Sequence, residues 1–425
     1  MDRVYLDHAA TTPLRPEARE AMLAAWDQSV GNPSSVHREG QKAKKLLEEA
    51  RDNIAASLCC LPEEVFFTSG GTESNNWALR SLAALRMKDT LCHSETTFYS
   101  ESETLTGTDK LSSLRRHIIV SEIEHPSILR TAEAMEREGV RVTRLSVDRY
   151  GLVSSESLQH AITEDTVLVS VMLANNEIGT IEPIRELSDI AHQQGALFHT
   201  DAVQAVGSIP VSIKDLGVDA LSFSGHKFGG PTGIGGLYVS QSIDKRFNQS
   251  SNGMSGKGNT GRFRSLIFGG EQERGHRAGT ENLAGVLGMA KALEMAVSDL
   301  DFDGKAPSGI ERLRDRLIAS VLDMIPEAHL CGHPGKRLPG NAHFVFDGVD
   351  GEALLLYLNV ERFACSSGSA CTSGSNETSH VLKAIGLSER EARSALRISI
   401  GRENTEEEVL SIVPVLQKLV QRLRK

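Results

Sequence analysis

The sequence predicts an α/β protein, in which a mostly parallel sheet lies between helices and a smaller αβ domain follows. Short apolar segments alternate with helical segments between residues 65 and 224, as expected for parallel strands joined by covering helices. The chain has 425 residues, whereas one compact domain usually has about 100 to 200. Hydrophobic residues make up 40% and charged residues 24%, which is ordinary for a globular protein with a sizeable core.

Each element of the sheet region is predicted from its local pattern. Residues 16–26 form a helix with Pro at its start, and residues 36–58 form a long amphipathic helix. A short strand at 65–67 leads through a Gly-rich turn at 68–75 into a helix at 77–85. The alternation continues with strands at 117–120, 142–145, 166–173, 197–200 and 220–224 and helices at 128–138, 155–162 and 184–194.

The pattern changes near residue 283, where a long helix, a mixed stretch and a closing helix at 405–423 follow. We therefore expect residues 16–282 to form the large, cofactor-binding domain. Residues 1–15 and 283–425 are expected to form the small domain. Two polar segments, 88–116 and 249–264, interrupt the alternation and are expected to be surface loops without chemistry.

Charge, apolar runs and cysteine content disfavour a nucleic-acid-binding, membrane-spanning or disulfide-rich secreted protein. The formal net charge of −10 disfavours nucleic acid as a partner, since phosphate backbones are repelled. The longest apolar runs, such as 166–174, are far shorter than the roughly 20 residues that span a bilayer, and no signal peptide is evident. Six cysteines are too few for a disulfide framework, so a cytoplasmic protein is expected. Four of them are expected to be structural or incidental: Cys59, Cys60, Cys92 and Cys331.

Three features follow predicted strands, at the sheet edge where ligands of such folds bind. Gly70-Gly71-Thr72 opens a helix and could bind a phosphate, although such turns are common. Asp201 could cap a helix or hold a pyridine nitrogen protonated. Lys227, in a Gly-rich turn, could be a solvated surface lysine or form a Schiff base with an aldehyde. Together they predict a site for pyridoxal 5′-phosphate.

These residues belong to a wider match. The sequence resembles the cysteine desulfurases of the class V aminotransferase family over nearly its whole length, from the segment Tyr5-Leu6-Asp7-His8-Ala9-Ala10-Thr11-Thr12 to residues 396–402. The most specific segment is 368–375, Gly-Ser-Ala-Cys-Thr-Ser-Gly-Ser, which is similar to the group whose nucleophilic cysteine lies on a long mobile loop. The resemblance implies the pyridoxal-phosphate-dependent transferase fold of type I.

The implied reaction converts L-cysteine to L-alanine and transfers the sulfur to an enzyme cysteine as a persulfide, for iron–sulfur cluster assembly or thiolation. Selenocysteine lysis or another class V reaction is the alternative, although transamination would need no thiol such as Cys371. A catalytically silent sulfur carrier of the same fold is a third possibility, which intact Lys227, Asp201 and His125 disfavour. The sulfur acceptor would be a protein such as an iron–sulfur scaffold, whose identity the sequence leaves open.

The resemblance also implies a role for each matching residue. Lys227 would hold the cofactor and act as the base, Cys371 would receive the sulfur, and His125 would stack on the ring and shuttle protons. Arg397, helped by Asn176, would bind the substrate carboxylate. The other cofactor contacts would be Gly71, Thr72, Asp201, Gln204, Ser224, His226 and, again, Asn176. Thr280 would complete the phosphate site of a partner subunit, which implies an obligate homodimer.

Plainer interpretations exist for several of these residues. His125 could be an ordinary helix-start histidine, and Arg397 could be a solvated arginine on an exposed strand face. Cys365 and Cys371 could be a metal pair, but no second pair lies at ligand spacing, and no resident metal is expected. Cys371 would contact a nascent iron–sulfur cluster only in passing. Cys365 follows an apolar stretch and is expected at the anchored base of the loop, away from the chemistry.

Overall fold

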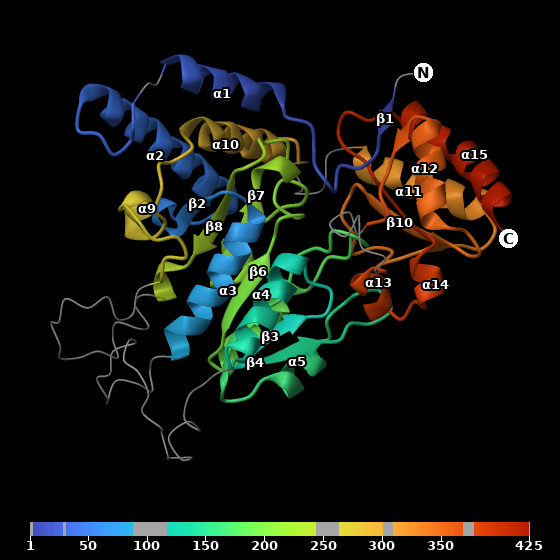
Figure 1. Cartoon of the computed structure of the whole chain (residues 1–425), viewed down its shortest axis with the longest axis horizontal. Helices are drawn as coiled ribbons and strands as arrows, with labels where there is room; N and C mark the ends of the chain where they lie inside the picture. Colours follow the sequence, from blue (N-terminus) through green and yellow to red (C-terminus); the bar gives the residue numbers. More distant parts are fainter. Residues whose placement is uncertain are drawn as a thin grey trace.

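The computed structural model describes residues 3–28, 31–87, 117–243, 263–300, 309–368 and 378–424. Figure 1 shows a large lobe built around a central sheet and a smaller lobe formed by the C-terminal part of the chain together with the N-terminal strand. The predicted loop 88–116 and nearly all of 249–264 lie outside the described residues. Within the described ranges, no helix is both long and apolar enough to cross a membrane.

The central sheet has seven strands in the order β2-β8-β7-β6-β5-β3-β4. Neighbouring pairs among β3 to β7 are parallel, and β8 runs antiparallel to both of its neighbours, so the predicted mostly parallel sheet is confirmed. The strands are β2 (Val65–Thr68), β3 (His117–Ser121), β4 (Arg141–Leu145), β5 (Thr166–Ser170), β6 (Leu197–Asp201), β7 (Ala220–Ser224) and β8 (Gly235–Val239).

Strand β8 is absent from the sequence prediction. It begins with two glycines, which are poor strand formers, and it follows the Gly-rich turn that contains Lys227. The structure explains one of these glycines, since a Cβ atom on Gly236 would lie 2.2 Å from the Phe223 ring of the neighbouring strand β7. The close approach of this ring, rather than local propensity, therefore selects glycine at this position.

Helices cover both faces of the sheet because neighbouring strand residues point to opposite sides. Ile119 packs into one core with the helices α2, α6 and α10, whereas Ile118 and Val120 pack into a second core with α3 and α4. The helices of this lobe are α1 (Pro16–Gln28), α2 (Arg38–Leu58), α3 (Gly71–Met87), α4 (Pro126–Arg137), α5 (Ser155–Ala161), α6 (Ile184–Gln193), α7 (Ile213–Leu216), α9 (Gln272–Gly275) and α10 (Leu283–Ser298).

The smaller lobe contains a three-stranded antiparallel sheet in the order β12-β10-β9, with a separate core. The N-terminal strand β1 (Val4–Tyr5) pairs in parallel with β11 (Phe363–Ala364) and so joins the chain's beginning to this lobe. Its other elements are β9 (Ala328–Leu330), β10 (Asn341–Phe346), β12 (Ala395–Ser399), α11 (Ile310–Met324), α12 (Gly351–Val360), α13 (His380–Ala384), α14 (Glu389–Ala392) and α15 (Glu406–Leu423).

Helix α10 bears on the domain boundary that we expect at residue 283. Its buried residues Val286, Met289 and Leu293 belong to the core of the large sheet, and Figure 1 shows the helix beside α1 and α2. We therefore propose that the two-domain division holds with the boundary after α10, between residues 299 and 309.

Candidate active site

A cavity of about 320 Å³ lies where the sheet meets the smaller lobe. Its walls come from the segments that follow β2, β3, β5, β6 and β7, together with the N-terminal segment and β12. The carboxyl ends of parallel strands meet at one edge of a sheet, which is why polar residues distant in sequence converge here. The cavity brings together Gly71, Thr72, His125, Asn176, Asp201, Gln204, Ser224, His226, Lys227 and Arg397.

Asp201 ends β6 at the floor of the cavity and is buried. One of its carboxylate oxygens accepts a hydrogen bond from the backbone N–H of Val203 at 2.9 Å, and the other accepts from Asn75 Nδ2 at 2.6 Å. Turns rather than a helix follow Asp201, so the helix-cap interpretation is wrong. A buried carboxylate held in this way suits a protonated pyridine nitrogen.

Asn75 is a cavity residue that the sequence analysis missed. It lies one helical turn after Thr72 on α3, a spacing that places both side chains on one face and could have drawn attention to it. Its Nδ2 also donates to Ser127 Oγ at 2.8 Å, while its Oδ1 is buried and has no hydrogen-bond partner among the described residues. An unsatisfied buried amide oxygen at the cavity wall is a group that a bound ligand could satisfy.

The N-terminus of α3 lines the cavity. Gly71 begins this helix, and a Cβ atom there would lie 2.6 Å from the Val203 side chain, so only glycine allows the close approach. Free N–H groups and the helix dipole favour an anion at this point. Burial, with Lys227 nearby, lowers the pKa of His226 to about 4, so its imidazole is a neutral hydrogen-bonding group at pH 7.

His125 is a helix-start residue that also lines the cavity. It is the N-cap of α4, because its Nδ1 accepts from the backbone N–H of Ser127 at 3.1 Å and lies 2.8 Å from Ser127 Oγ. It also lines the cavity, and burial lowers the pKa of its imidazole, which favours the neutral ring. The cap fixes the ring plane, which is what a residue stacked on a cofactor requires.

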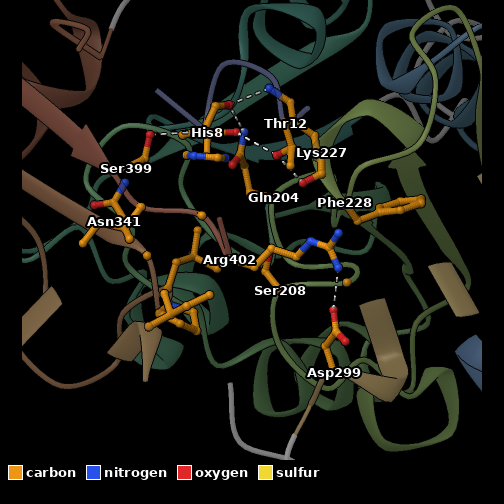
Figure 2. Close-up of a pocket in the computed structure, with 18 of the residues that line it drawn as sticks. His8, Thr12, Gln204, Ser208, Lys227, Phe228, Asp299, Asn341, Ser399 and Arg402 are labelled. Carbon is orange, nitrogen blue, oxygen red and sulfur yellow. Dashed lines mark hydrogen bonds and ion pairs between the residues drawn. The ribbon is translucent and has the colours of Figure 1, made fainter. Parts of the chain in front are cut away.

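Lys227 ends a short 3₁₀ turn after β7 and lines the cavity. Its Nζ donates to the backbone carbonyls of Ala9 at 2.7 Å and Ala10 at 2.9 Å. Gln204 Nε2 donates to the Ala9 carbonyl as well, at 3.0 Å. Figure 2 shows Lys227 and Gln204 at the wall of a second, smaller cavity of about 120 Å³, which His8, Asp299 and Arg402 also line. The N-terminal segment therefore forms the partition between the two cavities.

Arg397 lies on β12 and is 2% exposed, so the interpretation as a solvated arginine is wrong. Its Nη2 forms an ion pair with Asp7 at 2.7 Å, and its Nη1 donates to the Asn176 carbonyl at 2.8 Å. Its Nε is buried and has no hydrogen-bond partner among the described residues. The guanidinium group is thus held through both of its Nη atoms, and its Nε–H is a buried donor without a described partner.

Three predicted residues need separate mention. Cys371 lies in segment 369–377, outside the described residues, although Gly368 immediately before this segment lines the cavity. Cys365 follows β11 and is partly buried, and burial strongly raises the pKa of its thiol, which makes the reactive thiolate unfavourable. Thr280 is exposed and does not line this cavity.

Nearly the whole chain is similar to known proteins. The family model described as aminotransferase class-V matches residues 4–108 and 104–412. The chain is 42% identical over 421 residues to a protein of Methanosarcina thermophila named cysteine desulfurase IscS, covering 99% of this chain and 93% of that protein. Two solved structures are similar: a NifS-like protein (TM-score 0.81, 34% identity, 99% of this chain and 100% of that chain) and SspA in complex with cysteine (TM-score 0.72, 32% identity, 93% and 98%). The similarity thus includes both lobes.

Proposed function

This chain belongs to the class V aminotransferase family and is a pyridoxal-phosphate-dependent cysteine desulfurase, and we propose that it works through the cavity residues described above together with Cys371. The observation that carries the assignment of residues is the convergence of Lys227, Asp201 and His125 beside the buried guanidinium of Arg397. We further propose that the sulfur taken from L-cysteine supplies iron–sulfur cluster assembly or thiolation.

The cavity fits the cofactor in its polar groups. Pyridoxal phosphate, when bound, supplies an aldehyde that condenses with amines and a ring that accepts electrons from the substrate. Asp201, held by Asn75, would keep the pyridine nitrogen protonated, and Lys227 would hold the aldehyde. The ring would lie against His125. The phosphate would be bound by Gly71, Thr72, Ser224 and His226, and the ring substituents by Asn176 and Gln204.

Substrate binding is assigned to Arg397 and Asn176. The free Nε of Arg397 is buried beside the cavity, and a carboxylate is the natural acceptor for a guanidinium fork. Asp7 and the Asn176 carbonyl hold the other two nitrogens, which fixes the plane of the guanidinium group and the direction of its Nε–H. This favours an α-amino acid with a free carboxylate as the substrate.

The chemical steps are divided between three side chains. The amine of Lys227 removes the α-proton of L-cysteine and later protonates the product. Neutral His125 takes the proton of the substrate thiol and returns it to the carbon atom that the sulfur leaves. The thiolate of Cys371 attacks the substrate sulfur, so that the new S–S bond forms while the substrate C–S bond breaks and its electron pair stays with the carbon fragment that becomes alanine. The products are L-alanine and a persulfide on Cys371.

Assembly is the part of the proposal that concerns a partner. Thr280 is exposed on this subunit, and the segment before it is tied to the phosphate-binding helix by an ion pair between Arg277 and Glu73 at 2.9 Å. We propose an obligate homodimer in which Thr280 reaches the phosphate site of the second subunit. A sulfur-acceptor protein would then take the sulfur from Cys371, and the enzyme would act in the cytoplasm.

The direct test is to incubate the purified protein with L-cysteine and a thiol reductant and to measure alanine and sulfide together. Equal amounts of both products, from protein that shows the visible absorption band of bound pyridoxal phosphate, are expected. L-selenocysteine is the comparison substrate. Alanine without sulfide, or turnover of L-selenocysteine alone, would contradict the proposed function.

A further inference from the structure

Glu177 lies between the two ends of the segment that carries Cys371. Ser379, two residues after this segment, donates its hydroxyl to Glu177 Oε2 at 2.6 Å. Gly368 immediately precedes the segment, and a Cβ atom built on it would lie 3.3 Å from the same oxygen. Gly368 has a φ of 97°, which side chains disfavour, so both the backbone and the space around it suit glycine. The carboxyl group of Glu177 is therefore bonded to the C-terminal end of the segment and lies close beside its N-terminal end.

Glu177 is itself fixed to the substrate-binding side of the cavity. Its backbone N–H donates to Asn175 Oδ1 at 2.9 Å, and its carbonyl accepts from Asn341 Nδ2 at 3.0 Å. It directly follows Asn176, whose carbonyl accepts from Arg397. Arg397 also donates to the Gly368 carbonyl at 3.3 Å. The ends of the segment and the proposed carboxylate-binding group thus form one hydrogen-bonded unit.

A second contact holds the C-terminal end of the segment at the residue before His125. His380 Nε2 donates to the backbone carbonyl of Glu124 at 3.0 Å, and Glu124 directly precedes His125. Ser379 and His380 are therefore bonded to the chain neighbours of the two residues that we assign to the substrate and the ring, Asn176 and His125. The described residues at both ends of the segment are thus bonded to cavity residues or to their chain neighbours.

The alternative is that Glu177 is only a buried structural carboxyl group. Glu182, in the same region, is such a group, and we compare the exposure and hydrogen-bond partners of the two. Both are 3% exposed. Glu182 accepts one hydrogen bond, from the backbone N–H of Val153, and has no described hydrogen bond to the ends of the segment. Burying a carboxyl group is costly unless its partners compensate, and only Glu177 has its side-chain partner at the end of the segment that carries the nucleophile.

We propose that Glu177 is a positioning residue for sulfur transfer, whose carboxyl group holds Ser379 beside Gly368 and at a fixed place relative to Asn176 and Arg397. This inference rests on the proposed function, in which Cys371 attacks the substrate sulfur. Loss of this carboxyl group should slow sulfur transfer but leave the binding of L-cysteine nearly unchanged. Binding of L-cysteine depends on groups that stay in place without this carboxyl group, whereas the approach of Cys371 depends on the ends of its segment.

The test compares Glu177→Ala, Ser379→Ala and the double variant in steady-state desulfuration of L-cysteine. We expect kcat to fall about 10- to 100-fold in each, because displacement of a reacting group by about 1 Å has effects of this size. KM should change less than about threefold, and the double variant should be no slower than the slower single variant. Glu177→Gln, which keeps the shape and an acceptor oxygen, should recover most of kcat.

Two matched controls exclude a general loss of structure. Glu182→Ala removes a carboxyl group with the same exposure, and Ser388→Ala removes the helix cap of α14 as Ser379→Ala removes that of α13. Both controls should keep kcat within about twofold of the wild type. If Glu177→Ala does not fold, Ser379→Ala and its combination with Glu177→Gln carry the same comparison.

Any of four results would overturn the inference. In the Ser379 and Glu177 variants these are an unchanged kcat or a change confined to KM. The others are an equal loss of kcat in Glu182→Ala and additive losses in the double variant. Because wild-type protein is assayed in parallel, a failure of the proposed function can be distinguished from a failure of the inference about Glu177. In that case the wild type itself would release no alanine and sulfide from L-cysteine.

Discussion

Arg397→Lys tests whether the buried guanidinium binds the substrate carboxylate. Lysine keeps the positive charge but has donors on a single nitrogen, so it cannot bond Asp7, the Asn176 carbonyl and a ligand with the geometry of the fork. In the structure two of these contacts are 2.7 Å and 2.8 Å long and use two different nitrogens, which leaves Nε for the ligand. The variant should therefore lose the contact to the substrate first.

The expected size of the loss follows from one hydrogen bond between charged groups. Such a bond contributes about 1.5 to 3 kcal/mol, which corresponds to a change of roughly 10- to 100-fold in an equilibrium constant. We expect the dissociation constant of L-cysteine, followed by the absorption change of the bound cofactor, to rise by this factor in Arg397→Lys. Arg402→Lys is the control, because Arg402 is bonded to Glu403 at 2.8 Å and lines the other cavity.

Cysteamine makes the assay specific, since it has the amine and thiol of L-cysteine but no carboxylate. The wild type should bind L-cysteine much more tightly than cysteamine, and Arg397→Lys should lose most of that preference while its affinity for cysteamine stays within about threefold. If the variant kept the wild-type preference, Arg397 would not be the carboxylate-binding residue.

Four further predictions concern other parts of the molecule. Lys227→Ala should abolish alanine release from L-cysteine, and a substantial remaining rate would contradict its role. Cys371→Ser should still bind the cofactor and L-cysteine but release almost no sulfide, whereas Cys365→Ser should keep most activity; mass spectrometry after treatment with L-cysteine should find the extra sulfur on the peptide that contains Cys371. The active unit should sediment as a dimer if Thr280 completes a partner's site, and a fully active monomer would refute this. Burial raises the pKa of Glu182 to about 8 from 4.5, so its contribution to stability is complete below pH 4.5 and is lost as the pH rises to about 8. Glu182→Gln should reduce the fall in unfolding free energy between pH 5 and 8 by on the order of 3 kcal/mol, measured by urea denaturation, and an unchanged slope would contradict the raised pKa.

Local patterns were sufficient for most of the large sheet. The predicted strand at 197–200 and helix at 184–194 agree with β6 (Leu197–Asp201) and α6 (Ile184–Gln193) to within one residue, because apolar periodicity and turn residues are local properties. The predicted strand at 166–173 ends at Ser170 in the structure. Its apolar run continues past the sheet because Val171, Met172 and Leu173 remain buried in the cores beyond the strand.

The supporting residues that the sequence analysis missed are held by contacts between distant parts of the chain. Asp7 pairs with Arg397 across 390 positions, and no local spacing indicates such a pairing. Asn75 is closer to a recognised motif, but its bond to Asp201 spans 126 positions. The motifs therefore identified polar groups that line the cavity, while the groups that orient them depend on the tertiary fold.

The N-terminal segment shows why this orientation is a property of the whole fold. Its strand β1 pairs with β11 in the smaller lobe, and Asp7, two residues later, fixes Arg397. The carbonyls of Ala9 and Ala10 then accept hydrogen bonds from Lys227 in the large lobe. A few consecutive residues thus connect the group assigned to the substrate carboxylate with the amine assigned to the α-proton. Because both groups must act on one amino acid, the path of this segment determines the distance between them, and that distance is fixed only when both lobes are folded together.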